Sequence, residues 1–200
     1  MDLAVIGITF GAIFLVELPD KTFIAALVLS TRYRPLLVWI GVGLAFGVQT
    51  AVAVTAGALV TLLPDVVIKC VAAAIFLIGA VLLFRTAPSA DAEEQEAEQE
   101  YAARATESKT GLKAVGAAFL VLFAAEWGDL SQLLTISLVA QYHEHLEVFL
   151  GAWGALLTVS GLAVIAGRVL LRHMKLSLLH YIGAAVCLTL GVATLYELLA

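Results

Sequence analysis

Six long apolar segments constrain the fold of this chain more than any other feature of its sequence. We place them at about residues 3–30, 36–62, 65–84, 113–140, 146–171 and 176–198. Each is near or above the roughly 20 residues that an α-helix needs to cross about 30 Å of hydrocarbon. Hydrophobic residues make up 62 % of the chain, whereas soluble domains usually contain about 45–50 %. The segments therefore predict an all-α integral membrane protein with six transmembrane helices in a lipid bilayer.

A polar segment between the third and fourth spans divides the chain into halves. It runs from about residue 86 to 112, is rich in Ala, Glu and Gln, and accounts for the net charge of −5. Such a composition cannot bury a core, so we expect a solvated helix or a disordered linker here. The predicted organisation is a first three-helix repeat at 1–85, an acidic connector at 86–112 and a second three-helix repeat at 113–200.

Two short polar motifs interrupt the apolar segments. The first is Glu17-Leu18-Pro19-Asp20-Lys21-Thr22, and the second, Glu126-Trp127-Gly128-Asp129-Leu130-Ser131, repeats its pattern about 109 positions later. Each motif has two carboxylates spaced i, i+3, which project from one face of a helix, around a helix-breaking residue. A charge at the centre of a bilayer costs about 2.5–3.5 kcal/mol on insertion scales, so the four acids indicate a functional site.

The same spacing relates other residues of the two halves. An offset that drifts from about 109 to 112 aligns Gly41 with Gly151 and Gly79 with Gly191. A repeat with an odd number of spans has its second copy inserted upside down, and inverted repeats place transporter sites near the midplane between the copies. We therefore expect two inverted three-helix repeats, and we expect the motif-bearing first helix of each to be kinked or broken at the midplane.

Inverted symmetry would bring the motif acids together as one site for a transported cation. The predicted ligands are Glu17, Asp20, Glu126 and Asp129, supported by Lys21, Thr22, Ser131, Gln132 and Gln49. Carboxylate, hydroxyl and amide oxygens, with carbonyls freed by the helix breaks, suit Ca²⁺, Mn²⁺ or Mg²⁺. Gln49 equally fits a hydrogen bond between helices. We expect no cofactor, because the metal ion is itself the substrate.

The charge of this site predicts exchange with protons. Four ionised acids and Lys21 sum to −3, and one divalent cation leaves −1, so the empty site should not stay fully ionised in a low dielectric. Cation binding would then expel protons, and cation release would recover them. The sequence therefore predicts an antiporter that exports a divalent cation while protons move inward.

Other functions were weighed against this one. A passive divalent-cation channel built on the same acids is the main alternative. A membrane thiol oxidoreductase is a weaker one, because the repeat offset aligns Cys70 with about Ile182 rather than with Cys187. We expect no enzyme activity, and the hydrolase motifs H-E-x-x-H and G-x-S-x-G do not occur in the sequence.

Basic residues near the span ends predict the orientation. They gather in the first, third and fifth connectors, whereas only Lys69 lies near the opposite surface. We therefore expect both termini outside the cytoplasm, the 86–112 connector inside it, and a multi-pass protein of the plasma (inner) membrane. We expect divalent cations and protons as substrates and no nucleic-acid partner, and the sequence leaves the oligomeric state open.

At the two motifs the sequence resembles the GDT family of membrane cation transporters, which is akin to the lysine-exporter superfamily. The family hallmark is two copies of E-x-G-D-[KR]-[ST], one in each three-helix half. The resemblance implies Mn²⁺ or Ca²⁺ transport, in exchange for protons, through the motif acids, with Mn²⁺ the first candidate. Two residues depart from the hallmark: Pro19 stands in place of Gly, and Leu130 in place of Lys or Arg.

Overall fold

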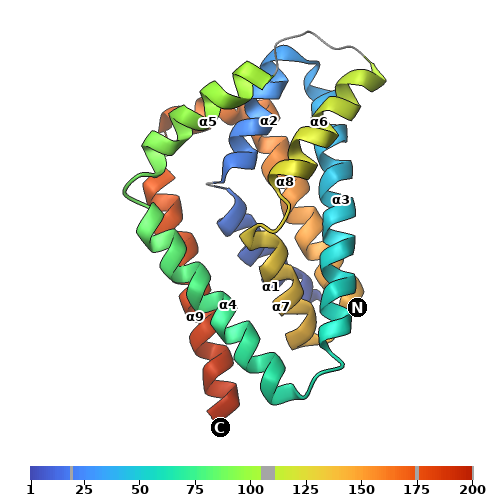
Figure 1. The fold of residues 1–200 in the computed structure, drawn as a ribbon, viewed down its shortest axis with the longest axis vertical. Helices are drawn as coiled ribbons and strands as arrows, with labels where there is room; N and C mark the ends of the chain where they lie inside the picture. The colour runs from blue at the N-terminus through green and yellow to red at the C-terminus, as the bar shows by residue number, and fades with distance from the viewer. Residues whose placement is uncertain (19, 105–110, 174–175, 200) are drawn as a thin grey trace.

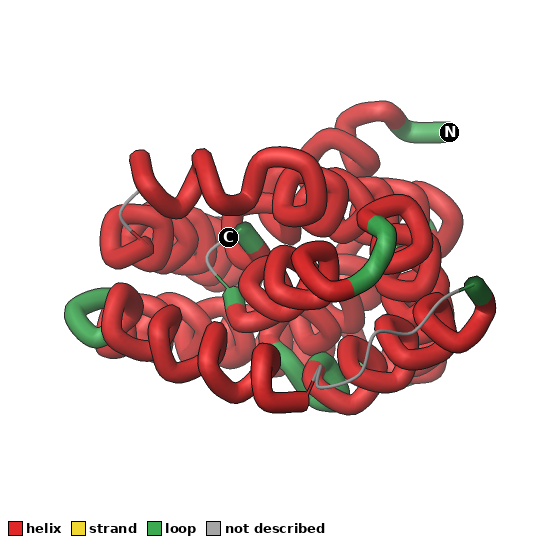
Figure 2. Tube along the Cα trace, turned by 90° about the horizontal axis from the view of Figure 1, so that it is seen from above, coloured by secondary structure: helices red, strands yellow, loops and turns green. Residues whose placement is uncertain are grey.

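The computed structural model describes residues 1–18, 20–104, 111–173 and 176–199. Within these ranges it contains helices and loops and no strand (Figure 2). The helices are α1 (Leu3–Glu17), α2 (Lys21–Arg32), α3 (Pro35–Val60), α4 (Asp65–Thr86), α5 (Ala90–Arg104), α6 (Leu112–Ala125), α7 (Leu130–Tyr142), α8 (His145–His173) and α9 (Leu176–Leu199). The all-α prediction is therefore confirmed for the described residues.

Four of the described helices, α3, α4, α8 and α9, are individually long and apolar enough to cross a membrane. Two further spans arise if each bent pair counts as one: α1 with α2, bent by 71°, and α6 with α7, bent by 73°. The four continuous helices begin and end within about two residues of the expected spans. Both chain ends lie in the lower half of Figure 1, away from α5.

The break between α6 and α7 has a local cause in Gly128. This residue has a φ of +83°, which side chains with a Cβ rarely adopt, so the helix cannot continue through it. The turn closes when the N–H of Asp129 donates to the carbonyl of Glu126 at 3.2 Å. Between α1 and α2 the N–H of Asp20 donates to the carbonyl of Glu17 at 3.0 Å. The expected role of Pro19 as helix breaker falls on a residue outside the described ranges.

The two halves pack against each other through matching pairs of helices. On one side α3 packs on α6, where a Cβ added to Gly41 would meet the carbonyl oxygen of Val115. On the other side α8 packs on α1, where a Cβ added to Gly151 would lie 2.7 Å from the carbonyl oxygen of Ile6. Glycine is therefore required at both contacts, because the backbones of the paired helices approach too closely for a side chain.

The long helices α3 and α8 pack against each other and are joined by two indole groups. Trp39 of α3 donates its Nε1–H to the carbonyl of Leu157 at 3.0 Å, and Trp153 of α8 donates to the carbonyl of Gly43 at 2.9 Å. A buried indole N–H needs such a partner. These two bonds hold α3 and α8 together.

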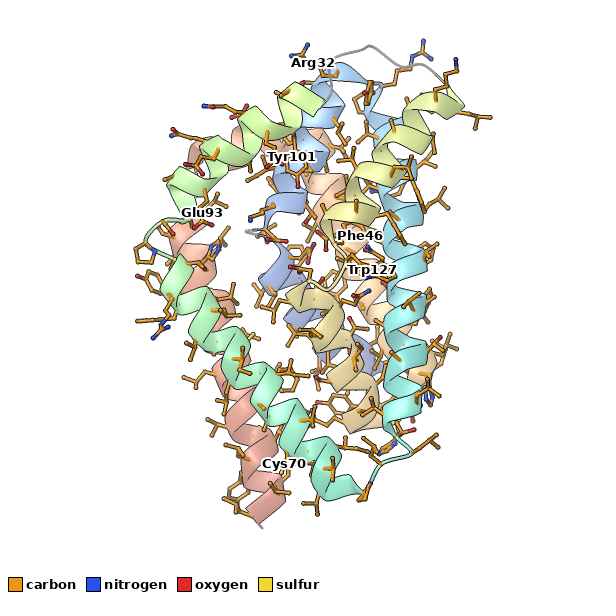
Figure 3. All side chains as sticks on the ribbon, in the orientation of Figure 1. Arg32, Phe46, Cys70, Glu93, Tyr101 and Trp127 are labelled. Carbon is orange, nitrogen blue, oxygen red and sulfur yellow. The ribbon has the colours of Figure 1, made fainter. Side chains whose placement is uncertain are left out.

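Helix α5, from the polar connector, docks onto the helical bundle. It contacts α2 and α9, and its buried face consists of Ala90, Ala97 and Tyr101, which are 3–6 % exposed. Figure 3 places Tyr101 on α5 close to α2. Of the two expected forms, a solvated helix or a disordered linker, residues 90–104 adopt the helix, and most of its described side chains are exposed. It differs from the expectation in having one apolar contact face, made of small alanines and one tyrosine.

Candidate functional site

The two helix breaks bring the four motif acids into one cluster. Glu17 ends α1, Asp20 precedes α2, Glu126 follows α6 and Asp129 precedes α7. One carboxylate oxygen from each lies within 4.8 Å of the others, a spacing that can hold a metal ion. Helices far apart in the sequence thus supply the four acids, as expected for a site shared by the two halves.

The two glutamates are the most deeply buried members of this cluster. Glu17 is 0 % exposed and Glu126 is 3 % exposed. Thr22 donates its hydroxyl to Oε1 of Glu17 at 2.8 Å. The other oxygen, Oε2, is buried without a hydrogen-bond partner among the described residues. A buried carboxylate oxygen without a donor is costly, and a bound cation would satisfy it.

The two aspartates cap the helices that follow the breaks. Asp129 accepts a hydrogen bond from the N–H of Ser131 at 3.2 Å through Oδ2, which is a normal N-cap bond. Asp20 occupies the N-cap position of α2 without a side-chain cap bond. Both carboxylates nevertheless interact with the backbone at the start of the following helix, Asp20 with the N–H of Lys21 and Asp129 with that of Ser131.

The carbonyl groups at the breaks are less available than the sequence suggested. The carbonyls of Glu17 and Glu126 accept from the N–H groups of Asp20 and Asp129. The carbonyl of Phe123 accepts from the Gln49 side chain at 2.8 Å. The site is therefore built mainly from carboxylates, and Gln49 forms the interhelical bond that was one of its two expected roles.

A cavity of about 600 Å³ reaches the cluster from the side where α4, α5 and α9 lie. Asp20, Glu126 and Asp129 line it, together with Lys21 and the α5 residues Glu93, Glu100 and Tyr101. Figure 3 shows Glu93 near the start of α5. The volume is large enough to admit a hydrated cation to three of the four acids.

A second cavity, of only about 10 Å³, lies on the α3, α7 and α8 side of the cluster. It is lined by Phe46, Gln49, Thr50, Ala53, Glu126, Ser131, Gln132, Thr135 and Leu156. Within the described ranges, Glu126 is the residue common to both cavities. The cluster is therefore open widely on one side and nearly closed on the other.

Several residues of these cavities were not singled out from the sequence. Thr135 lies four residues after Ser131 on α7 and lines the same cavity, so helical spacing alone could have identified it. Glu93 of the connector and His180 of α9 line the large cavity. Nothing in the local sequence signals their position, because it depends on how α5 and α9 dock.

Comparison with known families decides what kind of protein carries this cluster. The family model described as "Divalent cation/proton antiporter GDT1" matches residues 5–91 and 114–200. The chain belongs to the GDT1 family. This confirms the resemblance inferred from the motifs, and the family description is that of a membrane cation transporter.

Individual relatives support the same assignment. A GDT1-like protein of Synechocystis is 34 % identical over 85 % of this chain and 89 % of its own length. The chloroplast PAM71 homologue of Arabidopsis thaliana is 28 % identical over 94 % of this chain but only 58 % of its own length. A Vibrio cholerae protein described as "Putative manganese exporter" is 28 % identical over 97 % of this chain and 92 % of its own. No solved structure matches the chain.

This GDT1 family member departs from the family hallmark at Leu130, whose place in the structure explains how an apolar residue fits there. Leu130 lies against Gly79 of α4. A Cβ added to Gly79 would lie only 3.0 Å from Cδ1 of Leu130. Lys21, at the matching position of the first motif, is exposed and lines the large cavity. The two motifs therefore differ in charge and in packing, although their acids share one cluster.

Proposed function

We propose that this protein exports a divalent cation, with Mn²⁺ as first candidate and Ca²⁺ as second, from the cytoplasm in exchange for protons. The observation that carries the proposal is the cluster of Glu17, Asp20, Glu126 and Asp129 at the inner end of a wide cavity. An all-oxygen ligand set suits hard divalent cations. The description of the Vibrio cholerae relative as a manganese exporter supports Mn²⁺ as the cargo.

Exchange with protons follows from the charge of the cluster. Four buried or half-buried carboxylates within 4.8 Å repel one another strongly in a low dielectric, so protons replace the cation when it leaves. No ion pair of the described residues joins Lys21 to one of the acids. The acids are therefore not simply structural partners of that lysine. Binding of the cation and binding of the protons exclude each other, because both use the same carboxylates.

We further propose that the two halves are inverted three-helix repeats around this site. Support comes from the pairing of α3 with α6 and of α8 with α1 through glycines at matching positions. Stacked rings also recur at the repeat offset, as Phe10 on Phe14 and Phe119 on Phe123, with 10° between the planes in both pairs. The separate family-model matches to the two halves agree with this arrangement.

The wide cavity then faces the cytoplasm, and in a bacterium the protein lies in the plasma membrane. The orientation rests on the basic residues near the span ends. Figure 3 places Arg32 at the same end of the molecule as α5, and basic residues near span ends favour the cytoplasmic side. The termini would accordingly lie outside.

Transport by purified protein in liposomes tests the proposed function. We expect uptake of Mn²⁺ into the liposomes to rise when a proton gradient drives protons out of them. We also expect it to exceed uptake of Mg²⁺. Asp20→Asn and Asp129→Asn should each abolish it, because each removes one charge from the shared cluster. Glu144→Gln, which changes an exposed acid in the turn before α8, should transport normally.

The same assay distinguishes the alternatives. Transport that is indifferent to the proton gradient would contradict exchange and indicate a passive channel. Normal transport by either aspartate variant would contradict a single site shared by the two halves.

A further inference from the structure

The interhelical bond made by Gln49 lies where the narrow cavity meets the end of α6. Gln49 is 5 % exposed on α3 and donates Nε2–H to the carbonyl of Phe123 at 2.8 Å. In a continuous helix that carbonyl would receive the N–H of Trp127. Because α6 ends at Ala125, the break leaves the carbonyl available to another donor, and Gln49 supplies it.

Among the residues of the first half that the structure describes, no equivalent side-chain bond occurs. There the carbonyl of Phe14 accepts from the backbone N–H of Leu18 at 3.0 Å. In α8 the offset of 110 that aligns Gly41 with Gly151 aligns Gln49 with Val159, whose apolar side chain has no donor. The side-chain bond therefore occurs on one side of the acid cluster, the side of the narrow cavity.

The narrow cavity leads away from the acids along α7. Its residues on that helix step by one turn from Ser131 to Thr135, toward the end of the molecule where Figure 1 shows both termini. A volume of about 10 Å³ holds at most about one water molecule, so no hydrated cation passes. Phe46 of α3, which Figure 3 labels, is 2 % exposed and is one of the side chains that keep this cavity narrow.

We propose that Gln49 is the positioning residue that closes the route from the acid cluster toward the end of the molecule holding the termini. While its bond to Phe123 is intact, α3 stays fastened to the end of α6 and the cation reaches the acids only through the wide cavity. When the bond breaks, the part of α3 around Gln49 moves away from the end of α6, and the narrow cavity widens into the second route. The inference rests on the proposed function, because such a closure matters only in a transporter with two routes to one site.

Thiol labelling tests this closure without any transport measurement. Ala53, one turn beyond Gln49 on α3, is 1 % exposed and lines the narrow cavity, so Ala53→Cys reports on its width. The exposed Cys70 is changed to Ser, and the buried Cys187 is kept as background. The protein is placed in lipid nanodiscs, where a membrane-impermeant thiol reagent reaches both faces.

Gln49→Leu keeps the size of the side chain but removes the donor. We expect Ala53→Cys to react about tenfold faster in the Gln49→Leu background, because losing one hydrogen bond shifts the closed–open balance by about that factor. Two controls test whether the change is local. Trp39→Phe removes a different bond of α3, and Ala163→Cys places the reporter at the aligned buried position of α8.

The outcomes separate closure from general loosening. The proposal is supported if Gln49→Leu speeds the labelling of Ala53→Cys but not of Ala163→Cys, and if Trp39→Phe has no such effect. Equal labelling with and without the Gln49 donor overturns it, as does an equal increase caused by Trp39→Phe or seen at position 163. Failure of cation transport in liposomes would contradict the proposed function but would leave the labelling result intact, so the two failures are distinguishable.

Discussion

The hydroxyl residues of the two motifs, Thr22 and Ser131, are placed differently against the acids. Thr22 donates its side chain to Oε1 of Glu17, whereas the backbone N–H of Ser131 caps α7 through Asp129. A group that hydrogen-bonds to a metal-coordinating side chain tunes metal affinity, and its loss typically lowers that affinity by about 10–100-fold. The hydroxyl of Thr22 therefore holds Glu17, and the backbone of Ser131 holds Asp129.

Thr22→Val tests the role of the first hydroxyl. The change keeps the β-branched shape but leaves Oε1 of Glu17 without its donor, so we expect affinity for Mn²⁺ to fall about tenfold. Isothermal titration in detergent measures it. Thr55→Val, which removes an exposed hydroxyl that bonds within α3, should bind normally; equal affinity in both variants would show that the Thr22 bond does not hold Glu17.

At this scale the sequence identifies the acids but not all of their partners. A carboxylate inside an apolar segment is conspicuous because of its desolvation cost, and the repeat pairs the two motifs. The partner of Gln49 was not predictable, since Phe123 lies 74 positions away and the contact depends on the rotation of two helices. The sequence accordingly left Gln49 with two roles, of which the structure contains the interhelical bond.

At the scale of elements, the contacts between halves depend on glycine at closely packed helix pairs. A Cβ on Gly151 would approach the carbonyl of Ile6 and the Cβ of Thr9, at 2.7 and 2.9 Å. Helices of membrane proteins associate largely through such close packing. The lengths of α3, α4, α8 and α9 were predictable from apolar runs, because the bilayer sets them. The pairing of α3 with α6 was not, because any glycine-bearing face could have served.

Two alanine substitutions test this packing. Gly41→Ala and Gly151→Ala should each destabilise the protein by about 1–3 kcal/mol, since the paired backbones must separate to fit a methyl group. Gly116→Ala on α6, where a Cβ would meet nothing within 4 Å, should be neutral or stabilising by up to about 1 kcal/mol. Thermal melting in detergent, followed by circular dichroism, compares them. A similar loss in all three variants would contradict the close-packing account.

At the scale of the whole molecule, α5 forms part of the wall of the wide cavity. Its composition is typical of a solvated segment because charged and amide residues outnumber apolar ones. The average hides a buried face made of Ala90, Ala97 and Tyr101. That face covers parts of α2 and α9. The same helix turns Glu93 and Glu100 toward the cavity, so the connector between the halves contributes to the surroundings of the substrate.

Ala97→Glu tests the docking of α5. A buried charge in place of the 6 % exposed alanine should release the helix from α2, because an unpaired charge is costly to bury. We expect amide hydrogen exchange in α5 to rise about tenfold or more, with exchange in α3 unchanged. Glu96→Gln, at an exposed position of the same helix, serves as the control; unchanged exchange in the Ala97→Glu variant would show that the face does not hold α5.

The glycine contacts also bear on how such a chain is made. Each motif-bearing helix finds its close-packed partner in the opposite half, α1 on α8 and α6 on α3. During synthesis the Gly41 face of α3, and the face of α1 that receives Gly151, therefore stay uncovered until the last three spans are inserted. The halves repeat in sequence, but neither is an independent folding unit. Assembly is completed only when the ribosome has delivered the second copy.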